Sequence, residues 1–134
     1  MSIDDLGSFP VDWKTARESG TFTKVTNDTS LKIISGEKTP VLLSFRASSD
    51  TVHMGEMTIP AGGIGPRQTE YDSHNGDSVF YVRKGTVTFL LPETDEVFEV
   101  HENEYVFLPE NTRYKCINYA AGLAVVIFIV APEL

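Results

Sequence analysis

Apolar and polar residues alternate along most of the chain beyond residue 40, a pattern typical of strands that bury one face. His53–Pro60 (HMGEMTIP) alternates and ends at Ala-Gly-Gly, and Val97–Glu104 (VFEVHENE) alternates before Tyr105–Pro109. Ser78–Gly85 and Thr86–Pro92 meet at a glycine, which predicts a hairpin. The other predicted strands are Val41–Ala47, Arg113–Tyr119 and Leu123–Ala131. Short strands separated by turns predict an all-β sandwich or barrel.

The N-terminal part of the chain has a weaker pattern. Only Val11–Ser19 (VDWKTARES) has a helical composition, and it follows a proline. The large apolar residues around it, such as Phe9, Trp13 and Phe22, are scattered without a clear period. A length of 134 residues suits a single domain. Because the pattern is weak at the start, we expect residues 1–35 to form an N-terminal extension and residues 36–134 to form the barrel.

Charge and composition exclude several classes of protein. The net charge is −8, and residues 51–134 carry 12 acidic and 5 basic residues, so a nucleic-acid or anionic membrane surface is not expected. The longest apolar run, LAVVIFIVA, is far shorter than the ~20 residues of a membrane helix. The start, MSIDDLGSFP, has acids where a secretory signal has Lys or Arg. One cysteine cannot form an internal disulfide. Taken together, these features predict a soluble, cytoplasmic protein.

The stretch from Gly65 to Gly85, GPRQTEYDSHNGDSVFYVRKG, resembles the first motif of the cupin superfamily. That motif has Gly, His-x-His, three or four residues, Glu, six residues and Gly. Counting back from Gly85 places Ser78 at the position of the motif's Glu. The same alignment places His74 at the second His and Asp72 at the first.

A later stretch, NEYVFLPENTRYKCIN, resembles the second cupin motif. Asn103 and Asn111 replace the two glycines of that motif, whereas Pro109 and Asn118 are retained. Tyr114 stands where the motif has its His.

The resemblance spans residues 40–131 and implies a small antiparallel jelly-roll barrel, open at one mouth, with a ligand site inside. Of the family's four usual metal-ligand positions, only His74 carries the expected residue. We therefore expect no metal cofactor. A divalent ion held by His74, Asp72 and Glu70 is the less favoured alternative, because such a ligand set is thin.

Three polar residues are the candidate catalytic group. If residues 70–74 form a strand, then Glu70, Asp72 and His74 share one face. A neutral His74 beside an ionised Asp72 would accept a proton, and the Tyr114 hydroxyl would stabilise negative charge on a substrate oxygen. The candidate catalytic residues are therefore His74, Asp72 and Tyr114, and the candidate ligand-binding residues are Glu70, Arg67, Ser78, Phe80 and Cys116.

For several of these residues, and for their neighbours, a structural role competes with the functional one. Cys116 is expected to be a buried, inert thiol, and Arg67 to pair with surface acids. His53 and His101 lie outside both motifs and are expected to be exposed or satisfied by hydrogen bonds. The aromatic residues expected in the core are Phe80, Phe89, Phe107 and Phe128.

Three functions remain open at this point. The first is a cupin that binds a small organic molecule and converts it by acid–base chemistry, as an isomerase, lyase or cyclase does. The second is a metal-free cupin that serves as a homodimerisation or regulatory binding module. The third is a metallocupin, similar to a dioxygenase, with shifted ligands. We also expect a homodimer, in which the N-terminal extension crosses to the partner subunit with Trp13 as its anchor.

Overall fold

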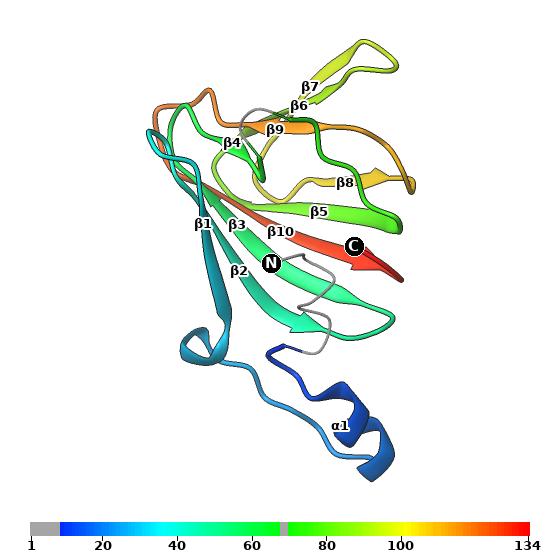
Figure 1. Ribbon diagram of the computed structural model, residues 1–134. Coiled ribbons are helices and arrows are strands. Elements are labelled where there is room, and N and C mark those ends of the chain that lie inside the picture. The colour runs from blue at the N-terminus through cyan, green and yellow to red at the C-terminus, as the bar shows by residue number, and fades with distance from the viewer. Residues whose placement is uncertain (1–8, 68–69) are drawn as a thin grey trace.

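The computed structural model describes residues 9–67 and 70–134, and its strands form two facing antiparallel sheets (Figure 1). The larger sheet has the order β1-β2-β3-β10-β5-β8 and the smaller one the order β4-β9-β6-β7. The larger sheet consists of β1 (Leu31–Ser35), β2 (Val41–Ser48), β3 (His53–Ile59), β10 (Ala124–Ala131), β5 (Asp77–Lys84) and β8 (Tyr105–Leu108). The smaller sheet consists of β4 (Ile64–Gly65), β9 (Lys115–Ile117), β6 (Val87–Leu91) and β7 (Glu96–Val100). The predicted all-β, antiparallel architecture is confirmed.

Each strand expected from the sequence has a counterpart, and two further strands appear. Strand β4 has two residues, too few for a visible alternation. Strand β1 lies in the range assigned to the N-terminal extension, yet it pairs with β2 from Leu31↔Phe45 to Ser35↔Val41. The larger sheet therefore begins at Leu31 and not at residue 36.

The core lies between the two sheets and is built from the inward-facing side chains. Phe80, Phe89 and Phe128 are buried there, as the sequence predicts. The prediction for Phe107 is wrong, because its side chain is 59% exposed. Val106 and Leu108 occupy the inward positions of β8, so alternation along the strand turns Phe107 outward.

The stretch that resembles the second cupin motif has left-handed residues at the two positions where the motif has glycine. Asn103 has a φ of 67° and Asn111 a φ of 61°, both in the left-handed region. Asparagine enters this region more readily than other residues with a side chain, so it can stand where the motif has glycine. The Asn111 N–H donates to the carbonyl of His74 at 2.7 Å, so this turn helps to fix the candidate site.

Helix α1 (Trp13–Ser19) lies beyond the ends of β2 and β3, away from the smaller sheet (Figure 1). Asp12 caps its start, since its carboxylate accepts from the N–H of Thr15, and Gly20 ends it in the left-handed conformation. None of its residues is buried, and its Arg17 pairs with Asp50 of the β2–β3 turn at 2.7 Å. Among the described residues, no helix has the length and apolar character needed to cross a bilayer.

Candidate functional site

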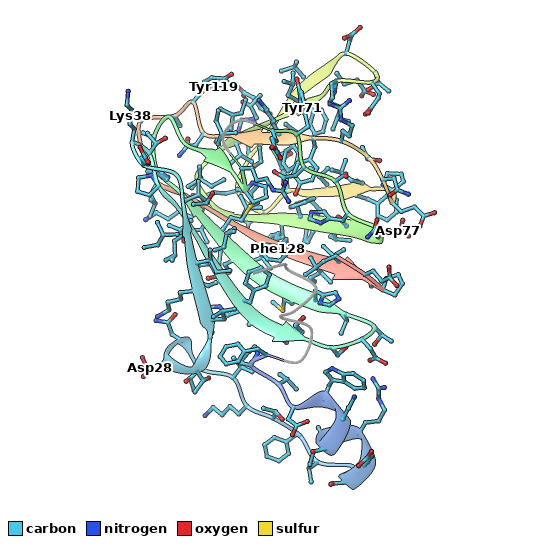
Figure 2. All side chains as sticks on the ribbon, in the orientation of Figure 1. Asp28, Lys38, Tyr71, Asp77, Tyr119 and Phe128 are labelled. Carbon is cyan, nitrogen blue, oxygen red and sulfur yellow. The ribbon has the colours of Figure 1, made fainter. Side chains whose placement is uncertain are left out.

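A cavity of about 30 Å³ lies between the two sheets, and its walls are almost entirely apolar. Phe128, one of the residues that line this cavity, is labelled in Figure 2. The cavity is lined by Leu43, Phe45, Met57, Pro66, His74, Phe80, Tyr114, Phe128 and Leu134. Five of these nine residues belong to strands of the larger sheet, whereas Pro66, His74, Tyr114 and Leu134 lie outside the strands. His74 and Tyr114 contribute the hydrogen-bonding side chains of this lining.

His74 and Tyr114 are joined directly, since Nε2 of the histidine and the tyrosine hydroxyl lie 2.9 Å apart. The backbones of Asp72 and Tyr114 exchange two hydrogen bonds, of 2.9 and 2.8 Å, and this isolated bridge fixes the backbone of the tyrosine just before β9. The Tyr114 ring is 1% exposed and packs against Phe80 and Phe89, with ring centroids 5.2 and 6.0 Å away. The hydroxyl is therefore held in one place by both backbone pairing and packing.

Burial keeps both members of this pair uncharged. Burial, with smaller contributions from the positive charges of Arg67 and His53, lowers the pKa of His74 to about 4. Burial also raises the pKa of Tyr114 well above its usual value, with a smaller contribution from the negative charge of Asp72. At neutral pH the pair is a neutral imidazole facing a protonated phenol.

Asp72 lies close to this pair along the chain, but its carboxylate turns toward Arg67. It accepts from the Arg67 backbone N–H at 3.2 Å, and its other oxygen lies 3.2 Å from the Arg67 Nε. Burial raises the pKa of Asp72 to about 6, and the Arg67 charge opposes that rise. The described contacts of this carboxylate are with Arg67, whereas His74 contacts Tyr114, so Asp72 fixes the loop and does not orient the imidazole.

The segment between β4 and β5 is a loop and not the strand that the shared-face argument requires. Its described residues make one isolated bridge, between Asp72 and Tyr114. The side chain of Glu70 is 66% exposed and pairs with the exposed Arg67 at 2.9 Å. Glu70, Asp72 and His74 consequently do not share a face, because a loop does not have the two-residue period of a strand.

The remaining sequence candidates are buried in different places. Phe80 lines the cavity. Ser78 is 2% exposed and lies on β5 opposite Leu108 and Val130. Cys116 is fully buried on β9, where burial raises the pKa of its thiol far above the usual value. Such a thiol stays protonated and is a poor nucleophile.

Two residues near the cavity were not singled out by the sequence. His53 is 7% exposed at the start of β3, and its Nδ1 forms a hydrogen bond with the Ser48 hydroxyl, in line with a satisfied histidine. Alternation with the buried Gly55, Met57 and Ile59 could have placed it inward. Leu134 follows the last strand, so no strand pattern indicates where its side chain lies.

The side chains at the cupin metal positions do not fit a divalent cation. The Asp72 carboxylate is bound by Arg67, the His74 imidazole is bound to Tyr114, and Tyr114 retains its proton. The fourth position holds Ser78, whose hydroxyl is a weaker ligand than a carboxylate. Within residues 9–67 and 70–134, no three His, Cys, Asp or Glu side chains gather around a common point.

Comparison with known proteins identifies the fold. The sequence matches no family model and no curated protein. Among solved structures, a predicted oxalate decarboxylase from Thermotoga maritima is similar, with a TM-score of 0.66 and 13% identity over 81% of this chain and 98% of the other. A cupin-superfamily sugar phosphate isomerase from Silicibacter pomeroyi gives a TM-score of 0.65 and 10% identity over 82% and 76% of the two chains. The polyketide cyclase RemF from Streptomyces resistomycificus gives 0.64 and 14% over 84% and 82%. The fold of this chain is that of the cupin superfamily.

Proposed function

We propose that this chain binds a small molecule inside its barrel and that His74 and Tyr114 form the polar contact for that molecule. The observation that carries the proposal is the neutral His74–Tyr114 pair at the wall of an otherwise apolar cavity. Ligand pockets have this composition, with apolar walls and a few placed polar groups. Two proteins of similar structure, the polyketide cyclase and the sugar phosphate isomerase, are named for reactions of small organic molecules.

The hydrogen bond between His74 and Tyr114 can be replaced by hydrogen bonds from this pair to a ligand. In the free protein each side chain satisfies the other, so neither polar group is left unpaired in the core. A ligand oxygen that enters between them accepts a hydrogen bond from the Tyr114 hydroxyl and also contacts the His74 imidazole. The net cost of this exchange is small, because one buried hydrogen bond replaces another.

Binding is supported better than catalysis by acid–base chemistry. A general base works best when its pKa lies near the working pH, whereas the pKa of His74 is lowered to about 4. Asp72 has a pKa of about 6, closer to neutral, but its carboxylate is bound by Arg67. Conversion of the ligand by an isomerase, lyase or cyclase reaction would therefore need a stronger base than His74 is in the free protein.

Phenol, a ring with one hydroxyl, is a suitable probe for this site, and its affinity can be measured by NMR titration. Tyr114→Phe removes the hydroxyl and keeps the buried ring, so we expect phenol affinity to fall about tenfold, which corresponds to one hydrogen bond. Tyr119→Phe is the matched control, because Tyr119 is 74% exposed and does not line the cavity. Equal affinities in the two variants would contradict the proposal.

A second function, self-association, is favoured by the outer face of the larger sheet. Outward side chains from four neighbouring strands form a continuous apolar patch there: Met54, Val79, Tyr81, Tyr105, Phe107, Ile127 and Ile129. Tyr105 is 70% exposed and Phe107 59% exposed, and exposed apolar patches of this kind mark interaction sites. The neighbouring Glu56 is already paired with Arg46 at 2.8 Å and with Arg83 at 3.2 Å.

We propose a second copy of this chain as the occupant of the outer face. The chain carries a net charge of −8, with seven acidic and no basic residues between Glu93 and Glu110. This acidic run includes the edge strand β8, so the proposed contact is the apolar patch itself, where the carboxylate of Glu56 is already paired with Arg46 and Arg83. Two-fold pairing also needs no second protein and is the commonest symmetry of soluble oligomers.

Light scattering tests this pairing. We expect a mass near twice 14.8 kDa at micromolar concentration, and a shift toward the monomer in Phe107→Glu, because a buried charge without a partner opposes association. Val97→Glu is the control, since Val97 is 63% exposed on β7, outside the patch. A mass near 14.8 kDa for the unaltered chain would show that the face does not pair.

A further inference from the structure

Two hollows meet at one side chain, that of Leu134. The inner one is the 30 Å³ cavity between the sheets. The outer one is an open groove of about 670 Å³, lined by α1, the β2–β3 turn, His53, Asn75 and the segment Pro132–Leu134. Leu134 belongs to the lining of both, whereas every other lining residue belongs to one of them.

The inner cavity is too small for an organic ligand in this conformation. Its volume is about 30 Å³, roughly a tenth of the ~300 Å³ at the lower end of the range for ligand pockets. A ligand can therefore enter only if a wall side chain moves. Leu43, Phe45, Met57, Phe80 and Phe128 are packed in the hydrophobic core, so a new side-chain rotamer at any of them must displace other core side chains.

Leu134 is held less firmly than those residues. It lies beyond the end of β10 and is partly buried against the core. Its carbonyl accepts one hydrogen bond, 3.3 Å long, from the side chain of the exposed Asn75. Displacing Leu134 breaks no strand pairing and opens the cavity into the groove.

The walls of the cavity restrict the ligand's chemistry as well as its size. The residues that line it include no acidic or basic side chain apart from His74, which is uncharged at neutral pH. A charged ligand would lose its hydration there without gaining an opposite charge. The aromatic rings of Phe45 and Phe128 meet edge to face, with centroids 5.7 Å apart, and can pack in the same way on a further ring.

We propose that the Leu134 side chain is a plug that limits the size of the ligand, and that the ligand is an uncharged ring compound with one hydrogen-bonding oxygen. This inference rests on the proposed function, since it concerns the same cavity. When Leu134 turns toward the groove, the ring occupies the space between Phe45, Phe80 and Phe128. The oxygen then reaches the His74–Tyr114 pair, and Leu134 determines how large a ring fits.

The test compares phenol binding among variants of the full chain by NMR titration. Leu134→Ala removes the plug, so we expect it to bind phenol at least ten times more tightly than the unaltered chain. Leu134→Phe fills more of the space, so we expect weaker binding than in the unaltered chain. Leu123→Ala is the matched control, because Leu123 is 43% exposed and outside the lining of both hollows. Thermal melting of each variant shows that it is folded.

The possible outcomes separate this inference from the proposed function. If Leu134→Ala and Leu123→Ala bind phenol with the same affinity, Leu134 is not a plug, even if Tyr114→Phe still weakens binding. If benzoate binds Leu134→Ala as tightly as phenol binds it, the ligand does not have to be uncharged. If Tyr114→Phe and Tyr119→Phe bind phenol with the same affinity, the proposed function is wrong, whatever the effect of substituting Leu134.

Discussion

Replacing Tyr114 by alanine should lower the free energy of unfolding by about 3–5 kcal/mol, the range for removing a large buried aromatic side chain. The ring is 1% exposed and fills the space beside Phe80 and Phe89. Its loss leaves a void, and it also leaves the buried His74 imidazole without its hydroxyl partner. Urea unfolding at pH 7 measures the change.

Tyr114→Phe separates the two contributions to this loss. It keeps the ring and removes only the hydrogen bond, so we expect a loss of about 1 kcal/mol. Tyr119→Ala serves as the control for side-chain size, because the exposed Tyr119 leaves no void. If Tyr114→Ala were no more destabilising than Tyr119→Ala, the packing described for the ring would be incorrect.

The second large effect concerns how the free energy of unfolding depends on pH. In the unaltered chain two contributions to this dependence oppose each other. Asp72 has a pKa of about 6, above its usual value of 3.8, so the folded state retains that proton longer and is destabilised as the pH rises from about 4 to about 6. His74 has a pKa of about 4, below its usual value of 6.5, so the folded state binds its proton less and is stabilised as the pH rises from about 4 to about 6.5. The two contributions have opposite signs over nearly the same range and largely cancel.

Single substitutions should reveal each contribution. In His74→Gln, stability relative to the unaltered chain should fall by about 2–3 kcal/mol between pH 4 and pH 6, since Asp72 is then uncompensated. In Asp72→Asn, relative stability should rise by a similar amount over that range, since only His74 remains. Urea unfolding at four pH values between 4 and 7 provides the comparison. Difference curves that do not change with pH would show that neither group titrates as its burial implies.

The fold could be predicted from this sequence because its determinants are local. The alternation in His53–Ile59 and the glycine after β5 mark strands and turns without reference to the rest of the chain. The asparagines at the glycine positions of the second motif adopt the left-handed conformation that the motif requires. Strand β1 is not evident in the sequence because its alternation covers only five residues at the sheet edge, where three are partly buried and two are exposed.

The candidate site could be predicted only in part, because its details depend on loops. His74 and Tyr114 are brought together, and that pairing follows from their motif positions. The direction of the Asp72 side chain depends on Arg67, five residues earlier in an irregular loop, and alternation does not apply there. The position of Leu134 depends on the path of the chain after β10, for which the sequence offers no periodic signal.

The arrangement of α1 divides the molecule into parts that open at different free energies. The helix has no buried residue, and the ion pair that joins its Arg17 to Asp50 is exposed. Opening the helix costs little buried area, so we expect its amide protons to exchange through a local fluctuation and those of β5 and β10 to exchange only when the barrel unfolds. Because Trp13 and Lys14 form one wall of the outer groove, a molecule that binds there with the helix in place stabilises the helix and slows that exchange.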